Sequence, residues 1–146
     1  MARQVLTYTV PEGKSRDAGK TFVITEMSAF EIESWAMRAL LLIMANNVLL
    51  PPDLSARVQS GEAGLADLAT LGLKSLSGLR YVDAKPLLDD MMSCVQIAPD
   101  KRNPSVLRDI VDDDIEEIMT IVELRKLIWG MHTNFLPAAD ARNTAT

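Results

Sequence analysis

The sequence predicts an α+β fold that is predominantly α-helical, with an N-terminal β-hairpin followed by about four to five packed helices. Two segments rich in β-branched and aromatic residues stand near the N-terminus, and apolar residues at helical spacing follow them. The 146 residues are 48% hydrophobic, which is enough for one compact core. We therefore expect one domain over residues 1–136, with the hairpin at 4–26, a helical body at 28–135 and a mobile tail at 137–146.

The hairpin is predicted from residues 4–10 and 20–26. Both segments have the β-branched and aromatic side chains that favour strands. The stretch between them is polar and contains Pro11, Gly13 and Gly19, which are typical of turns and loops. The pattern therefore predicts two strands joined by a long loop.

The first helix is predicted to begin at Ser28, because Ser28 and Glu31 have the S-x-x-E spacing of a capping box. Met27 and Ile32 occupy the two positions of a hydrophobic staple around it. The apolar residues that follow widen from a stripe until they cover most of the helix surface, which predicts a central helix. Pro51 and the residue after it should end this region.

Four further elements are expected after the first helix. Asp53 can cap a short helix that reaches about Ser60, and apolar spacing supports another helix over residues 62–77. Asp83 can cap a helix that carries Pro86 in its first turn and ends near Ile97. Residues 98–104 form a loop, and the β-leaning residues 106–111 leave open a second small hairpin with residues 94–97.

The last helix is predicted to begin in the acidic run at residues 112–117, where Asp114 and Glu117 again have capping spacing. Its acidic residues lie at the positive end of the helix dipole, and Arg125 and Lys126 lie toward the negative end. This helix should continue past Ile128 to about Phe135.

Composition excludes several classes of protein. The chain has 15 Lys and Arg against 20 Asp and Glu, a net charge of −5, which argues against nucleic acid as the main partner. Its single cysteine, Cys94, and single histidine, His132, exclude a disulfide scaffold and zinc sites of the Cys₄ or Cys₂His₂ kind. No apolar run approaches the roughly 18 residues of a membrane span. We therefore expect a cytoplasmic protein that binds neither nucleic acid nor membrane.

The segment from Gly13 to Thr21 superficially resembles a phosphate-binding P-loop. It has five residues between its glycines, whereas the motif has four. A P-loop also leads into a helix whose amides face the phosphates, but the residues after Thr21 have a strand pattern. The sequence therefore disfavours nucleotide binding here.

The remaining polar residues are expected to have structural roles and not catalytic or metal-binding ones. The acidic run 112–117 lacks the spacing and the glycine of an EF-hand loop, and helix capping accounts for carboxylates at a helix start. Asp89 and Asp90 fall on the solvent face of their helix. Cys94 is expected to be a small buried hydrophobe, and His132 has no serine or cysteine matched to it by spacing. The expectation is a protein without catalytic residues, metal or cofactor.

Several segments carry a family resemblance. They are residues 19–27, 35–40, 86–97, 113–117, 124–125 and 132–135. Together they resemble small proteins of long-tailed bacteriophages and prophages that are known as tail assembly chaperones. The resemblance covers roughly residues 15–136, and it includes no catalytic motif.

The resemblance implies a non-enzymatic protein of the infected host's cytoplasm. Such a protein binds the tape-measure protein, keeps it soluble, helps to recruit tail-tube subunits, and is absent from the mature virion. Two other interpretations stay open: a structural tail or head-completion protein that remains in the virion, and an enzyme supported only by the P-loop-like segment and the acidic run. The sequence also leaves open whether the chain forms a homo-oligomer.

The eight methionines and the broad apolar helix surfaces are either ordinary core or a surface that can repack against partners. The family offers no defined site residues, so candidates for binding the tape-measure protein follow from their apolar character alone. They are Trp35, Met37, Met91, Met92, Trp129, Met131 and Phe135.

Overall fold

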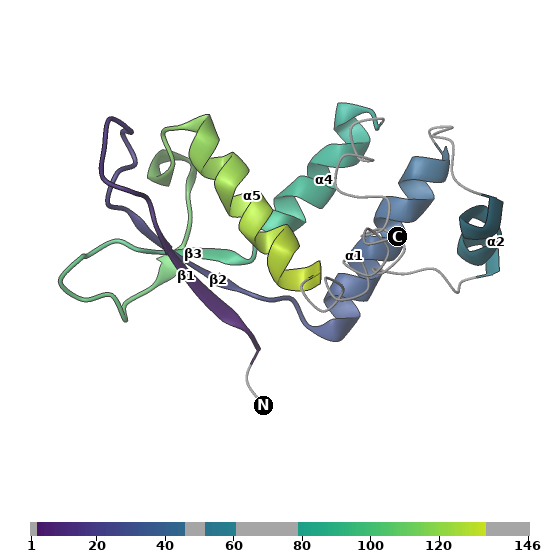
Figure 1. Cartoon of the computed structure of the whole chain (residues 1–146), viewed down its shortest axis with the longest axis horizontal. Helices are drawn as coiled ribbons and strands as arrows, with labels where there is room; N and C mark the ends of the chain where they lie inside the picture. Colours follow the sequence, from purple (N-terminus) through teal and green to yellow (C-terminus); the bar gives the residue numbers. More distant parts are fainter. Residues whose placement is uncertain (1–2, 46–51, 61–78, 134–146) are drawn as a thin grey trace, which may run out of the picture. The chain divides into compact units, whose positions relative to one another are not determined.

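The computed structural model describes residues 3–45, 52–60 and 79–133 (Figure 1). They form two compact units. The sheet unit combines Met1–Glu26 with Asp89–Met131, and the helical unit combines Met27–Leu88 with His132–Thr146. The predicted helix-rich α+β class is confirmed. That the two units fold as one domain over residues 1–136 stays a prediction.

The sheet unit is built on a four-stranded antiparallel sheet in the order β1-β2-β3-β4. Its strands are β1 (Val5–Thr9), β2 (Thr21–Thr25), β3 (Val95–Ala98) and β4 (Arg108–Asp109). The pairing of β1 with β2 confirms the predicted N-terminal hairpin. The pairing of β3 with β4 confirms the second small hairpin that the sequence left open.

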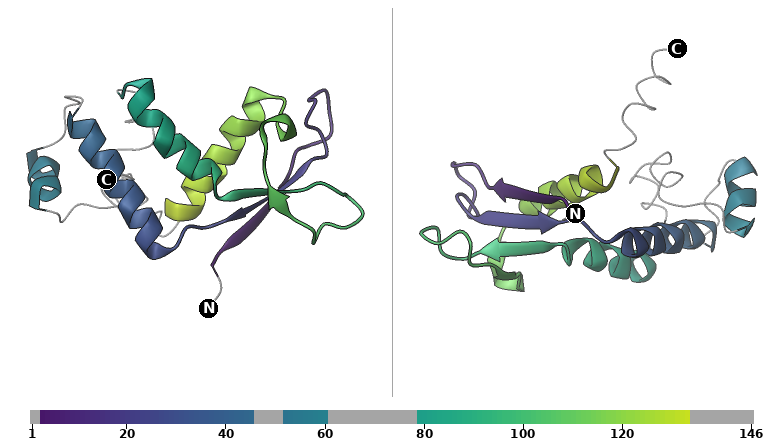
Figure 2. Two further views of the ribbon diagram at one scale, coloured as in Figure 1. Left: turned by 180° about the vertical axis from the view of Figure 1, so that it is seen from behind. Right: turned by 90° about the horizontal axis from the view of Figure 1, so that it is seen from below.

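The core of the sheet unit lies on one face of this sheet. Phe22 and Ile24 alternate along the central strand β2 and are completely buried. The helix α5 (Ile118–Thr133) lies along the sheet (Figures 1 and 2), and its Leu124 and Ile128 are buried as well. Burial of each such side chain contributes about 1.5–3 kcal/mol, so this face provides the main stabilisation of the unit.

The predicted start of the last helix in the acidic run is wrong. Asp112–Asp114 form a single 3₁₀ turn, Ile115 is extended, and α5 begins only at Ile118. The reason is that the Asp114 carboxylate accepts a hydrogen bond from the Val111 amide and binds Arg108, so it stabilises the 3₁₀ turn instead of capping α5.

The helical unit contains α1 (Ala29–Ala45), whose predicted start is confirmed. The Glu31 amide donates to Ser28 Oγ at 3.2 Å, and the Ser28 amide donates to Glu31 Oε2 at 3.3 Å, which is the reciprocal bonding of a capping box. The helix was expected to be central because it is apolar on most of its surface, and its fully buried residues lie on one face. That face carries Trp35, Ala36, Ala39, Leu40 and Ile43.

The unit also contains α2 (Pro52–Ser60), close to the predicted short helix. The helix α4 (Tyr81–Met92) differs from its predicted bounds of Asp83 and Ile97 at both ends. It ends at Met92 because the residues from Val95 onwards pair with β2 as β3. It begins before Asp83, so Pro86 lies inside the helix and not in its first turn. The predicted helix at 62–77 and the tail at 137–146 lie outside the described residues.

Candidate partner-binding surface

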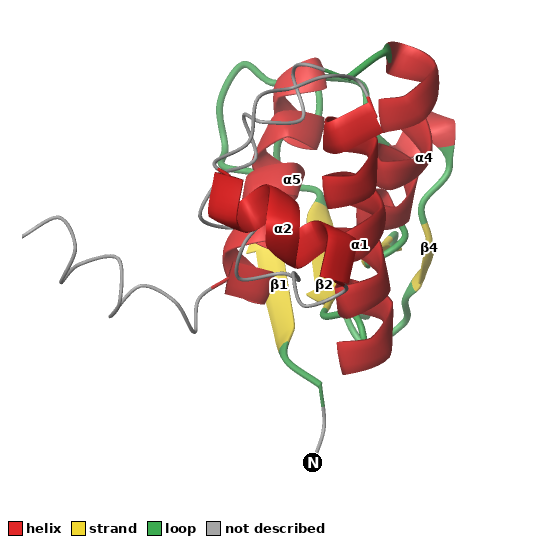
Figure 3. Cartoon of the chain, turned by 90° about the vertical axis from the view of Figure 1, so that its right-hand side faces the viewer, coloured by secondary structure: helices red, strands yellow, loops and turns green. Residues whose placement is uncertain are grey.

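The helices α1 and α4 lie side by side in the helical unit (Figure 3). The indole Nε1 of Trp35 donates a hydrogen bond of 3.0 Å to the carbonyl oxygen of Leu87, and both side chains are buried. A buried indole N–H needs such an acceptor, since leaving it unpaired would cost about 1–3 kcal/mol. This contact therefore places the turn of α1 that contains Trp35 beside the turn of α4 that contains Leu87.

Large apolar side chains are exposed at one end of this helix pair. The two helices run antiparallel (Figure 1). Leu41 lies six residues after Trp35 in α1, and Tyr81 lies six residues before Leu87 in α4. Leu41 and Tyr81 consequently lie toward the same end. Leu41 is 50% exposed, Tyr81 73% and Val82 67%. We call these three residues the apolar end.

Phe30, in the first turn of α1, is 90% exposed and lies at the opposite end of that helix from Leu41. None of these exposed residues was among the sequence-derived candidates. The sequence showed that α1 is apolar on most of its surface, but it could not show which of those side chains the fold leaves in solvent.

The structure places the sequence-derived candidates in three helices. Trp35 and Met91 are buried, so in this conformation they offer a partner almost no surface. The half-buried candidates are Met37 on α1, Met92 on α4, and Trp129 and Met131 on α5. Phe135 lies outside the described residues. Partner binding by the half-buried four stays a prediction.

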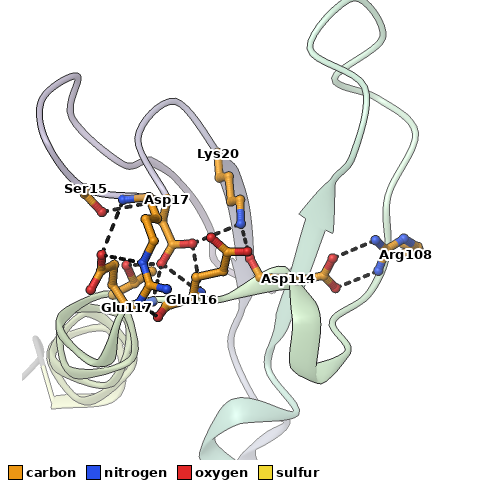
Figure 4. Close-up of polar contacts among 9 residues, drawn as sticks. Ser15, Asp17, Lys20, Arg108, Asp114, Glu116 and Glu117 are labelled. Carbon is orange, nitrogen blue, oxygen red and sulfur yellow. Dashed lines mark hydrogen bonds and ion pairs between the residues drawn. The ribbon is translucent and has the colours of Figure 1, made fainter.

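A buried carboxylate, Asp17, organises the polar end of the sheet unit (Figure 4). Its side chain is 0% exposed, although it lies in the long loop between β1 and β2. Its oxygens accept hydrogen bonds from the amides of Glu116 and Glu117 at 2.9 Å each, and from the Thr120 hydroxyl at 2.7 Å. Asp17 thus caps the start of α5 from far away in the sequence, the role that the sequence assigned to the acidic run.

Burial alone would raise the pKa of Asp17, because a carboxylate is less stable when it is removed from water. Hydrogen bonds from the Glu116 amide, the Thr120 hydroxyl, Lys20 and the Glu117 amide outweigh that effect. The pKa of Asp17 consequently lies well below the usual range, and the group is ionised at neutral pH.

Lys20 connects Asp17 to Asp114, and Arg108 binds the Asp114 carboxylate. The Lys20 ammonium donates to Asp17 Oδ1 at 2.9 Å and to the carbonyl oxygen of Asp114 at 2.8 Å. The Arg108 guanidinium binds both oxygens of the Asp114 carboxylate at 2.7 Å. The Arg108 guanidinium lowers the pKa of Asp114 against the opposing effect of burial. We refer to Asp17, Lys20, Arg108 and Asp114 as the Asp17 network.

The Asp17 network also accounts for the P-loop-like segment. Ser15 Oγ accepts a hydrogen bond from the Asp17 amide, and Lys20 is held by two oxygens of the same unit. The segment then continues into β2 and not into a helix. Gly19 has a φ of +82°, a conformation that favours glycine, and its amide donates to the Val10 carbonyl. The loop is therefore built for internal contacts.

His132 and Cys94 are buried. His132 Nε2 accepts a hydrogen bond of 2.9 Å from the Met27 amide, next to the capping residue of α1. This contact fits the structural role that the sequence favoured for His132. In the described ranges, no three or more His, Cys, Asp or Glu residues are grouped so that they could hold a metal ion. Of the helices that the structure describes, none has the length and apolar character to span a bilayer.

Comparison with known protein families, with curated proteins and with solved structures gives no match for this chain.

Proposed function

We propose that the chain is a non-enzymatic tail assembly chaperone of a long-tailed bacteriophage or prophage, acting in the host cytoplasm by binding the tape-measure protein. The observation that carries the proposal is the apolar end, where Leu41, Tyr81 and Val82 are each at least half exposed. Single exposed apolar residues are ordinary, but large ones exposed toward the same end of two neighbouring helices are a candidate for an interaction site. The resemblance of the sequence to that chaperone family supplies the identity of the partner.

The chemistry of the apolar end suits a chaperone for a helical protein. An amphipathic helix buries its apolar side chains against such a surface and leaves its polar side facing water. The aromatic ring of Tyr81 provides a large contact area and a hydroxyl that can stay hydrated at the rim. The chain's net charge of −5 favours its solubility while the partner's apolar segments are covered.

The test is co-expression of this chain with the tape-measure protein of the same phage, followed by affinity capture and mass spectrometry. We expect a stoichiometric complex that resists salt, and a tape-measure protein that is insoluble when expressed alone. The double variant L41S/V82S should weaken capture, while Glu33→Ser, an exposed polar position on α1, should not. Folded wild-type chain that captures no tape-measure protein would refute the proposal.

The alternative is a structural tail or head-completion protein, in which the apolar end would be covered permanently by a neighbour in the particle. Mass spectrometry of purified virions separates the two functions. Absence of the chain favours the chaperone, and presence in fixed copy number favours the structural protein.

A further inference from the structure

The strand β1 lies at one edge of the sheet (Figure 2), and its outer backbone groups face away from β2. The Glu26 amide donates to the Gln4 carbonyl, and the Val10 amide donates to the Lys20 carbonyl. In an antiparallel pair the bonded positions alternate, so the even-numbered residues of β1 bond to β2. The N–H and C=O groups of Val5, Thr7 and Thr9 therefore point outward.

No backbone or side-chain group among the described residues bonds to these outward groups. Proteins commonly protect such an edge with lysine, proline, a bulge or a very short strand. β1 has five residues, contains no lysine or proline, and pairs with β2 in unbroken register. Its Val5 is 59% exposed and its Leu6 36% exposed. The edge is thus open to a further strand.

We propose that β1 pairs with β1 of a second copy of this chain, antiparallel and centred on Thr7, so that two sheets join across a two-fold axis. This proposal does not depend on the proposed chaperone function. The register places Thr7 opposite Thr7 of the second copy and Val5 opposite Thr9. It is the one symmetric register in which all five strand residues of each copy are paired, with every outward N–H and C=O used.

The side chains of β1 also fit this register. Leu6 and Tyr8 lie on the same face as the buried Ile24 and Phe22, and in the dimer each Leu6 lies opposite Tyr8 of the other copy. Aliphatic and aromatic side chains paired across strands stabilise a sheet.

The proposed contact favours a closed dimer over a filament. The opposite edge of the sheet is β4, which has only two residues, so β1 has little to pair with there. Pairing of identical strands about a two-fold axis closes the assembly. Because a single strand pair buries less than the roughly 1,000 Å² typical of stable interfaces, the dimer should dissociate on dilution.

Charge reversal at Thr7 tests the register directly. Thr7 is exposed, and in the dimer its side chain faces Thr7 of the second copy across the two-fold axis. Either Thr7→Lys or Thr7→Glu alone should therefore give monomers. Mixing the two variants should restore a dimer containing one copy of each. Val106→Lys, an exposed position in the loop between β3 and β4, serves as the control and should leave the wild-type dimer intact. The measurement is sedimentation velocity of the full chain over a concentration series, with circular dichroism to confirm folding.

Three outcomes would overturn the proposal: wild-type chain that is monomeric up to its solubility limit, a dimer that survives both single variants, or variants that do not dimerise when mixed. A cross-linking experiment gives an independent result if the charged variants fold poorly. Thr7→Cys should form a disulfide-linked dimer on mild oxidation, whereas Val106→Cys, exposed in the loop between β3 and β4, should not. Cys94 is buried and leaves this comparison clear, and equal cross-linking of both variants would likewise refute the register.

Discussion

Replacement of Asp17 by asparagine should destabilise the sheet unit by about 3 kcal/mol. Asparagine keeps the shape of the side chain, but it replaces one acceptor oxygen by an NH₂ group. If the remaining oxygen is Oδ2, it still accepts from the Glu117 amide, the Thr120 hydroxyl and, at 3.2 Å, the Glu116 amide. The NH₂ group then faces Lys20 and the Glu116 amide, which are also donors. At least two hydrogen bonds are then lost, and those that remain are no longer made to a charged acceptor.

The magnitude follows from the environment of each lost partner. A hydrogen bond to a charged group contributes about 1.5–3 kcal/mol, and the Glu116 amide keeps only its longer bond of 3.2 Å to the other oxygen. The Lys20 side chain is 29% exposed and can turn toward water, so its loss costs less than that of a fully buried ion. Together these contributions give about 3 kcal/mol, with the lost bond to the Glu116 amide as the largest part.

The assay is urea denaturation followed by far-UV circular dichroism, with hydrogen exchange at the start of α5 as a local measurement. Thr120→Val is the matched control, because it removes one donor to Asp17 and leaves the carboxylate charged. It should cost about 1 kcal/mol. A loss below about 1 kcal/mol for Asp17→Asn, or equal losses for both variants, would refute the assignment of Asp17 as the distant cap of α5.

Four further predictions follow from the same geometry. Because folding lowers the pKa of Asp17 and that of Asp114, their contribution to stability is present at neutral pH and should be lost as the pH falls below about 4. The loss should be less steep in Asp17→Asn. Urea titrations at successive pH values measure it. Arg108→Met should lower the urea midpoint more than Arg16→Met. The Arg108 guanidinium binds both oxygens of a buried carboxylate. The Arg16–Glu117 pair is solvent-exposed and should contribute little. Ser28→Ala should cost about 1 kcal/mol in thermal or urea unfolding through loss of the α1 cap, and no change would contradict the capping box. ATP with Mg²⁺, or Ca²⁺, should leave the melting temperature unchanged in a thermal-shift assay, because Ser15 already accepts a hydrogen bond from the Asp17 amide and Lys20 is held in the Asp17 network. A rise of several degrees would revive the enzyme interpretation.

The elements that local sequence could predict are those whose determinants are adjacent in the chain. The hairpin follows from two strand-like segments around a glycine-containing loop, and the start of α1 follows from Ser28 and Glu31 alone. The end of α4 and the start of α5 depend on distant residues instead. Pairing with β2 takes Val95 and its neighbours into a strand, and Asp17 supplies the cap that Asp114 does not.

The surfaces could be predicted only in part, for a similar reason. Hydropathy marked α1 and α5 as apolar, but Trp35 is buried because its indole meets the Leu87 carbonyl, a contact between helices far apart in sequence. Phe30 and Tyr81 have the same apolar character and are exposed. No spacing rule separates these cases, since exposure depends on which neighbours the fold brings close.

The two proposed interactions use different surfaces, and this makes them separable by experiment. The apolar end belongs to the helical unit, whereas the β1 edge belongs to the sheet unit. A Thr7→Lys chain that is monomeric but still captures the tape-measure protein would show that self-pairing is not needed for that binding. An L41S/V82S chain that dimerises but captures nothing would show that the fold and the β1 edge are intact, so the lost capture could be assigned to the apolar end. Loss of both properties in either variant would instead indicate that pairing at β1 and binding at the apolar end are coupled.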